Sequence, residues 1–278
     1  MIFRARGHIL DCSRRPYVMG VVNITPDSFS DGGRYNDPAA AVEQARHLCA
    51  EGADIIDLGA ESSRPGAQMV PADEEIERLL PVVEALAGNT PALLSIDTTK
   101  AVVAEACLNA GAHMINDISG FMSDERLPAV VKHFDAGCIL MHRRGTAETM
   151  QTLTKYNDLF GEIGGELRIS IGRAKAAGIA DRSIMIDPGI GFAKTVEQNL
   201  LIINHLEKFC QLGYPVLLGP SRKSFIGKVL GRVNPAERIW GTAAAVALGV
   251  AHGANVVRVH DVAAMRDVVR MAHAIVNQ

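Results

Sequence analysis

The stretch Gly52-Ala-Asp-Ile-Ile-Asp57 belongs to a pattern that occurs three times and decides the fold of this chain. The other two copies are Gly111-Ala-His-Met-Ile-Asn116 and Gly253-Ala-Asn-Val-Val-Arg258. Each copy follows an amphipathic stretch and begins with glycine, the residue that most readily adopts the left-handed conformation that ends a helix. Each continues as a short apolar run that finishes on a polar residue. The pattern predicts a repeated helix–strand unit.

Counting with this unit gives eight strand candidates. They are continuous apolar runs, as expected of parallel strands covered by helices. Eight strands with intervening helices favour a single-domain α/β protein with a (β/α)₈ TIM barrel over residues 1–278, and a doubly wound sheet is the alternative. Residues 1–16 lie outside the repeat and are expected to form a short N-terminal hairpin that plugs the barrel bottom. The strand candidates are 17–23, 54–58, 92–97, 112–116, 137–141, 184–187, 215–219 and 255–260.

Helix starts are marked by two Asx-Pro pairs, Asp37-Pro38 and Asn234-Pro235, which place a capping side chain before a proline at the first helical position. The second pair predicts a helix from Pro235 to His252. This helix is rich in alanine and glycine, and such a smooth face suits close packing between subunits. Packing within the barrel shell explains it nearly as well.

The composition excludes several classes of protein. The chain has 278 residues and a net charge of −3, which gives no reason to expect nucleic acid or an anionic membrane as a partner. Five scattered cysteines indicate reduced thiols, since none pairs at a redox or zinc-like spacing. The N-terminus lacks the apolar core of a signal peptide, and the most apolar stretch, 241–254, is too short to span a bilayer. A cytoplasmic location is therefore expected.

Polar residues lie at the end of every one of the eight predicted strands or in the loop that follows it. In a TIM barrel these ends form the mouth, where reactive groups gather. A single aspartate after a strand is more often a helix cap than a catalyst, but eight polar ends together predict a site. The residues are Asn23, Asp57, Asp97, Asn116 with Asp117, His142, Asp187, Ser221 with Lys223, and Arg258 with His260.

The types of residue at the mouth indicate a class of ligand. Asp97, Asn116 and Asp187 suit the hydrogen-bonding edge of a flat, nitrogen-rich heterocycle. Arg64, Lys223, Arg258 and His260 suit an anion or phosphate. Asn23 offers a neutral oxygen to Mg²⁺ shared with substrate phosphates. These features predict a heterocycle and a phosphate as ligands.

Two loops and two glycine-bearing motifs bear on this prediction. Long connections after the first two strands, around Gly32 and over 62–66, are typical of binding loops or lids, although variable surface is the alternative. PGIGFAK at 188–194 lacks the third glycine of a dinucleotide fingerprint, and GPSRKS at 219–224 lacks the glycine before the lysine of a phosphate-binding P-loop. Neither motif therefore predicts a nucleotide site.

Seven blocks together resemble the dihydropteroate synthases. They run in that family's order from near Pro16 to the C-terminus. They are MGVVNITPDSFSDGG (19–33), DLGAESSRPGA (57–67), SIDTTK (95–100), NDISG (116–120), IDPGIGFAK (186–194), GPSRKSFIG (219–227) and VRVHDV (257–262).

This resemblance implies a reaction in folate biosynthesis. The family condenses 6-hydroxymethyl-7,8-dihydropterin diphosphate with p-aminobenzoate to give 7,8-dihydropteroate and diphosphate, uses Mg²⁺ and is a target of sulfonamides. It also implies a homodimer. The catalytic residues would be Lys223, Asp97 and Arg258.

The resemblance also assigns the remaining site residues. Those implied for the pterin are Asp97, Asn116, Met141, Asp187, Phe192, Gly219 and Lys223. Those implied for the diphosphate are Asn23, Arg258, Val259 and His260, with Asn23 also associated with the metal. Those implied for p-aminobenzoate are Phe29, Ser63, Arg64, Pro65, Phe192, Ser221 and Arg222.

The chain departs from the family pattern at two places, and two rival functions remain. Ser63 stands where the family usually has threonine, and the Arg143-Arg144 pair is unexpectedly basic. A methyltetrahydrofolate methyltransferase shares the pterin-binding barrel but would not need Arg222 with Lys223. A non-catalytic pterin-binding protein is the other alternative, although the residues whose loss would indicate it are present.

Overall fold

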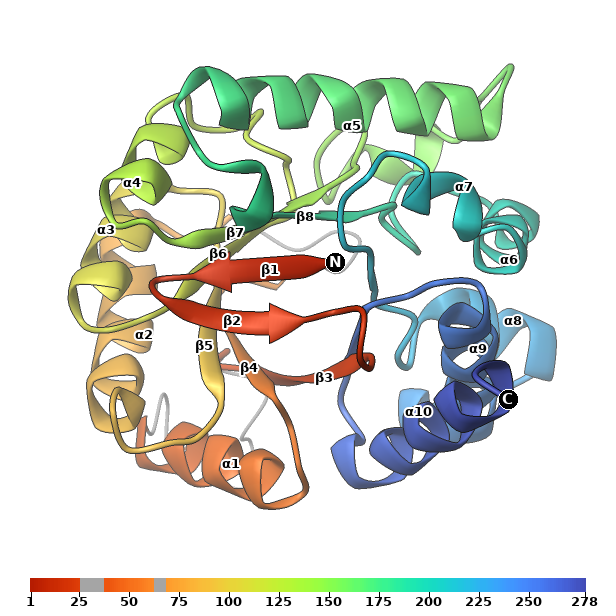
Figure 1. Cartoon of the computed structure of the whole chain (residues 1–278), viewed down its shortest axis with the longest axis horizontal. Coiled ribbons are helices and arrows are strands. Elements are labelled where there is room, and N and C mark those ends of the chain that lie inside the picture. Colours follow the sequence, from red (N-terminus) through yellow and green to blue (C-terminus); the bar gives the residue numbers. More distant parts are fainter. Residues whose placement is uncertain (26–37, 63–68) are drawn as a thin grey trace.

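The chain folds into a closed barrel of parallel strands surrounded by helices (Figure 1). The computed structural model describes residues 1–25, 38–62 and 69–278. Within these ranges, eight strands form one sheet in the order β8-β7-β6-β5-β4-β3-β10-β9. The strands are β3 (Tyr17–Asn23), β4 (Ile55–Gly59), β5 (Leu93–Asp97), β6 (Met114–Asp117), β7 (Gly137–Met141), β8 (Ile184–Asp187), β9 (Leu217–Leu218) and β10 (Val256–Val259).

The barrel closes between its first and last strands in the sheet order. Ile186 of β8 forms a parallel bridge with Val216, the residue before β9, and the Ile186 amide donates to the Pro215 carbonyl at 2.9 Å. The predicted (β/α)₈ barrel is therefore confirmed, and the doubly wound alternative is wrong. Strand β9 is shorter than the predicted range 215–219. The proline at the start of that range, Pro215, has no N–H to donate to the ladder.

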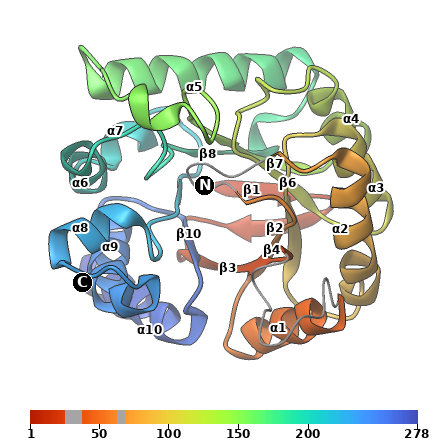
Figure 2. The same ribbon diagram turned by 180° about the vertical axis from the view of Figure 1, so that it is seen from behind.

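The helices cover the outside of the barrel (Figures 1 and 2). The three glycines of the repeated pattern have positive φ, at 98° for Gly52, 111° for Gly111 and 100° for Gly253, as expected at a helix end. The helices are α1 (Pro38–Ala50), α2 (Ala72–Leu86), α3 (Ala101–Asn109), α4 (Leu127–His133), α5 (Leu159–Ala176), α6 (Val196–Asn204), α7 (Glu207–Cys210), α8 (Ser224–Leu230), α9 (Ile239–Ala251) and α10 (Val262–Val276).

One predicted helix is divided in two. Pro235–Arg238 is a 3₁₀ turn, and the α-helix begins at Ile239 rather than at Pro235. The Asn234 side chain accepts from the Ala236 amide, so the predicted cap is present. The Arg238 guanidinium donates to the carbonyls of Arg232 at 3.1 Å, Val233 and Arg222 at 2.8 Å. These contacts tie the turn to the preceding loop, which favours the tighter geometry.

The inner face of the barrel changes from apolar to polar along each strand. Side chains alternate between the faces, so every second residue points inward. On β5, Leu93 lies at the bottom, Ser95 in the middle and Asp97 at the top, and on β10 Val256 is followed by Arg258. The strands therefore present an apolar floor and a polar mouth.

The predicted N-terminal hairpin closes the bottom. Strands β1 (Ile2–Ala5) and β2 (His8–Asp11) pair antiparallel and lie across the barrel in Figure 1. Phe3 packs with the inward residues at the strand starts, including Met114, Ile139 and Met185, in one buried cluster. The Arg6 guanidinium fixes the hairpin by donating to the carbonyls of Leu108 at 2.7 Å and Ala112 at 2.9 Å.

All five cysteines are free thiols in the structure. Of the helices in the described part of the chain, none is long and apolar enough to cross a membrane.

Candidate active site at the barrel mouth

An arginine held between two carboxylates lies at the centre of the polar network in the mouth. Arg258 Nε donates to Asp57 Oδ2 at 2.6 Å, and its Nη2 donates to Asp97 Oδ2 at 2.8 Å. Asn116 Nδ2 donates to the same Asp57 oxygen at 3.0 Å. These residues come from strands β4, β5, β6 and β10. They form one hydrogen-bonded unit that fixes the direction of the guanidinium.

This unit carries more negative than positive charge. Desolvation by burial raises the pKa of Asp97 to about 7, although Arg258 opposes the rise, and the nearby Asp57 carboxylate adds to it. Asp57 Oδ1 is buried and has no hydrogen-bond partner in the described structure. The network thus leaves one buried acceptor below the mouth without a donor.

A second set of charged groups, from β8 and the segment after β9, lies at the same mouth. Asp187 ends β8 and accepts the Gly189 amide at 2.7 Å. Lys223, which follows β9, donates to the Ile190 carbonyl, and its ammonium lies 4.8 Å from the centre of the Phe192 ring. Burial lowers the pKa of Lys223 to about 8, against the effect of Asp187. The same burial raises the pKa of Asp187, against the effect of Lys223.

Gly219 lies between the Arg258 side chain and the Lys223 ammonium. A Cβ at Gly219 would lie 3.8 Å from both Arg258 Cβ and Lys223 Nζ. A side chain longer than alanine would therefore extend beside the Lys223 ammonium. Met141 ends β7 and packs with Phe192 in a small buried cluster. The structure thus gathers all seven residues predicted for the pterin at the mouth.

The residues predicted for the diphosphate lie on two neighbouring strands. Asn23 ends β3, Arg258 lies in β10, which pairs with β3, and His260 directly follows β10. His260 Nδ1 lies 3.0 Å from Ser221 Oγ, which also accepts the His260 amide at 3.2 Å. Val259 is buried in the core between barrel and helices, so only its backbone can face the mouth.

The residues predicted for p-aminobenzoate are only partly described. Phe29, Ser63, Arg64 and Pro65 lie outside the described residues. Arg222 has a φ of 58°, and its guanidinium forms two hydrogen bonds with Asp261, at 3.0 and 2.5 Å. Ser221 and Phe192 lie at the mouth as predicted, whereas Arg222 turns toward the start of α10.

Two features were missed by reasoning from sequence. Asp57 was noted as a polar strand end but given no role, although it holds both Arg258 and Asn116. The buried Lys194 was given no role either, and it contacts His142 Nδ1 at 3.1 Å. The signal for Asp57 was its place at the end of the copy that begins at Gly52, the position that Asn116 and Arg258 occupy in the other two copies.

The structure also accounts for half of the unexpected arginine pair. Arg144 donates to Glu166, to Glu162 at 2.7 Å and to the Lys155 carbonyl at 2.9 Å, and it stacks over Tyr156 at 4.1 Å. The Arg144 charge is therefore paired with acidic residues of α5. Arg143 has its pKa lowered by burial, against the opposing effect of Asp117.

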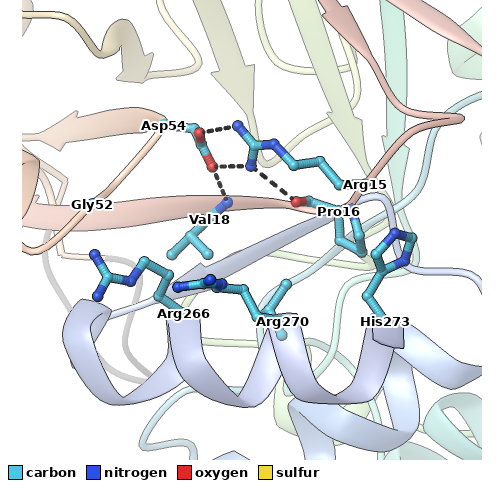
Figure 3. A pocket seen from close by; sticks show the side chains of 9 residues that line it. Arg15, Pro16, Val18, Gly52, Asp54, Arg266, Arg270 and His273 are labelled. Atoms are coloured by element: carbon cyan, nitrogen blue, oxygen red, sulfur yellow. Dashed lines mark hydrogen bonds and ion pairs between the residues drawn. The ribbon is translucent and has the colours of Figure 1, made fainter. Parts of the chain in front are cut away.

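A separate cavity of about 470 Å³ lies at the other end of the barrel, between β3 and α10 (Figure 3). Asp54 there is already saturated, because it accepts from Arg15 at 2.6 and 3.0 Å and from the Val18 amide at 2.9 Å. Arg266 and Arg270 of α10 also line the cavity. This cavity contains none of the strand-end residues, so the mouth remains the candidate site.

Within the described ranges, the mouth contains no ready-made cage for a metal ion. Among the residues that the structure describes, no group of three or more His, Cys, Asp or Glu side chains is placed to hold one. Asn23 supplies one neutral oxygen. This donor suits an ion such as Mg²⁺, which keeps most of its waters and takes further ligands from substrate phosphates.

Comparison with known proteins agrees with this geometry. The family described as pterin binding enzyme matches residues 19–260. A dihydropteroate synthase of Synechocystis sp. is 48% identical over 267 residues, which are 96% of this chain and 92% of that protein. In these comparisons the chain is aligned over nearly its whole length.

Solved structures give the same result. The dihydropteroate synthase of Yersinia pestis in a sulfonamide complex has a TM-score of 0.94 and 40% identity, with 100% of both chains covered. That of Xanthomonas albilineans with 4-aminobenzoic acid has a TM-score of 0.92 and 42% identity, covering 99% of this chain and 98% of that one.

Proposed function

Because this chain belongs to the dihydropteroate synthases, within the pterin binding enzyme family, we propose that it makes 7,8-dihydropteroate. It is a transferase that joins 6-hydroxymethyl-7,8-dihydropterin diphosphate to p-aminobenzoate and releases diphosphate. The observation that carries this proposal is the gathering of Asp97, Asn116, Asp187, Lys223 and Arg258 at one barrel mouth.

Each group has a role that follows from its surroundings. The acceptors of Asp97 and Asp187 receive the N–H groups of the pterin ring, and the ring lies between the two charged pairs. Phe192 provides an apolar surface beneath the Lys223 ammonium, where an aromatic ring can stack. A buried site of this kind rejects rings that leave its polar groups unpaired.

The reaction needs orientation and charge stabilisation rather than a protein nucleophile. The amine nitrogen of p-aminobenzoate forms a bond to the methylene carbon of the pterin, and the bond from that carbon to the diphosphate oxygen breaks. One proton leaves the amine nitrogen. Arg258 and His260 stabilise the departing diphosphate, and Lys223 holds the ring in line with the amine.

Mg²⁺ fits the diphosphate side of the mouth. Asn23 would hold it through its side-chain oxygen, and the ion would neutralise charge on the leaving diphosphate. The prediction is that diphosphate binds more tightly with Mg²⁺ than without it. Equal affinities in calorimetry would contradict a shared site, whatever the result of an activity assay.

The function is tested by mixing the protein with Mg²⁺, the pterin diphosphate and p-aminobenzoate. We expect equimolar diphosphate and dihydropteroate, measured by a coupled phosphate assay and by chromatography. Release of diphosphate without dihydropteroate would indicate hydrolysis and contradict the proposal. No release above that of a Lys223→Ala variant would leave a non-catalytic pterin-binding protein as the better description.

A homodimer is part of the proposal. Its support is an apolar stripe on α9, where Trp240 is 81% exposed and lies on one face with Ala244, Leu248 and Ala251. Met271 and Ile275 on the adjacent α10 are also exposed. Exposed apolar groups in such number favour a protein partner. Light scattering that gave a 29.7 kDa particle at micromolar concentration would contradict this.

The cytoplasmic location stays a prediction.

A further inference from the structure

The loop between β8 and α6, residues 188–194, has an unusually constrained backbone. Gly189, Gly191 and Ala193 all have positive φ, at 73°, 85° and 49°. A Cβ at Gly189 would lie 2.0 Å from the His142 carbonyl oxygen, so only glycine fits there. Alanine in the left-handed region costs about 1 kcal/mol. Such a conformation persists only where the surroundings hold it in place.

Lys194 is the group that holds this loop from inside. Its side chain is buried, with the residue only 4% exposed. Its ammonium contacts the Gly189 carbonyl at 3.0 Å, the Phe192 carbonyl at 2.9 Å and His142 Nδ1 at 3.1 Å. A lysine ammonium has three N–H donors, and these three acceptors use all of them.

A buried lysine is energetically unfavourable at position 194 if its only role is to fill the space inside the loop. In the described part of the chain it forms no ion pair, and an unpaired buried cation is unfavourable. Burial accordingly lowers the pKa of Lys194 to about 7, against the effect of Asp187. An apolar side chain of similar length would fill the same space without this penalty. The charge and its donors therefore point to a role beyond packing.

The partner of Lys194 is itself fixed by a second set of contacts. Because His142 Nδ1 accepts from Lys194, the ring proton lies on Nε2, which contacts Glu166 Oε2 at 3.0 Å. Glu166 also accepts from Arg144, whose guanidinium covers the Tyr156 ring. The Tyr156 hydroxyl donates to the Ala193 carbonyl at 3.1 Å. The contacts therefore return to the loop and hold it from a second side.

The loop in turn positions Lys223. The Ile190 carbonyl accepts from its ammonium, and the Phe192 ring lies beside it. The Lys223 stem passes over Gly191, where a Cβ would lie 3.0 Å from Lys223 Cδ. Three successive parts of the loop therefore define where this ammonium can lie.

We propose that Lys194 is a positioning residue for Lys223: its three hydrogen bonds lock the 188–194 loop in the shape that holds the Lys223 ammonium beside Asp187. This inference rests on the proposed function, because it concerns the same site. It assigns to Lys194 no contact with substrate. Loss of its donors should act on turnover through Lys223 and on little else.

The test is a double-mutant cycle between Lys194→Met and Lys223→Ala. Methionine keeps most of the lysine stem but removes the charge and the donors. Alone, Lys194→Met should lower kcat/KM by about 30-fold, and in the Lys223→Ala background by less than about threefold. Additive effects in the cycle, or a single variant within threefold of wild type, would overturn the proposal.

Three controls keep this result interpretable. Lys132→Met removes an exposed lysine on α4 and should leave kcat/KM unchanged. If Lys194→Met folds poorly, Tyr156→Phe removes the outer contact with Ala193 and enters the same cycle, where additivity again contradicts the proposal. Absence of dihydropteroate synthesis by the wild-type protein would instead contradict the proposed function, which separates the two failures.

Discussion

The two ends of this barrel are built from the same eight strands but have opposite chemistry. At the bottom, Phe3 and the inward residues of the strand starts form an apolar cluster. At the top, Asp57, Asp97, Asp187 and Arg258 are largely buried ionisable groups. Burying apolar surface stabilises a fold, whereas burying charges costs free energy unless they are fully paired. The bottom therefore stabilises the fold, and the top uses part of that stability for function.

This comparison predicts that the two ends respond differently to substitution. Changes at the bottom should alter the free energy of unfolding and leave catalysis of the folded enzyme intact. Changes at the top should alter catalysis and leave stability equal or higher.

The largest effect is expected from Phe3→Ala in the hairpin plug. Phe3 is fully buried and packs against the barrel floor, so its truncation should destabilise the protein by about 3–5 kcal/mol. Urea unfolding measures this, and Ile2→Ala, half exposed on the same strand, is the matched control. A folded Phe3→Ala enzyme with tenfold lower kcat/KM would break the proposed division between the ends.

The next largest effect is expected from Asp187→Asn, which removes a charged partner of the pterin. The amide keeps the size of the side chain and an acceptor for Gly189, but it removes the charge. Affinity for dihydropteroate should fall by about 2–3 kcal/mol, as for other hydrogen bonds to charged groups. Calorimetry measures it, with the exposed Asp181→Asn as control. Unchanged affinity in the folded variant would refute the assignment.

A smaller effect concerns the pH dependence of stability. The pKa of Asp97 is raised to about 7 in the folded protein, above its value in the unfolded chain. The folded state therefore holds this proton where the unfolded state has lost it, and stability falls as the pH rises from about 4 to about 7.

Asp97→Asn should remove this contribution. The stability advantage of the variant over wild type should grow from pH 4.5 to pH 7 and be constant above it. Urea unfolding of both proteins at three pH values measures the difference, which cancels the titration of other groups such as His142 and Lys194. An advantage that does not change with pH would show that Arg258 keeps Asp97 ionised throughout.

Most of the fold followed from the sequence because the repeat marks it three times. A Gly-Ala pair, an apolar run and a polar end are local features, and the eight strands fall within two residues of their predicted limits. The exceptions depend on local chemistry in three dimensions. The strand at Leu217 is shortened by Pro215, and the turn at Pro235–Arg238 is held by contacts of Arg238 that the sequence does not display.

The candidate site was predicted only in part, for a related reason. Strand ends in a barrel meet at one mouth, so sequence order was enough to bring Asp97, Asn116 and Arg258 together. Partner choice among them was not predictable, since Arg258 and Asp57 are 201 residues apart and meet only when the barrel closes. The contacts of Lys194 were missed because two of its three acceptors are backbone carbonyls, which every residue possesses.

The smallest effect is expected in the middle layer, where the apolar and polar ends meet. Ser95 lies between Leu93 and Asp97 on the inner face of β5, and its buried hydroxyl has no hydrogen-bond partner in the described structure. Removing an unsatisfied buried polar group avoids its desolvation cost, whereas the lost oxygen leaves only a small void. Ser95→Ala should therefore change the free energy of unfolding by less than about 1 kcal/mol. Any change should be an increase in stability. Because Asp97 above it keeps its contact with Arg258, kcat/KM should also stay within about twofold, a difference below 0.5 kcal/mol. Urea unfolding and steady-state kinetics measure both. A loss above 2 kcal/mol would mean that the hydroxyl is bound within the barrel, for instance through a water shared with Asp57 Oδ1, and that the polar end extends one layer deeper than proposed.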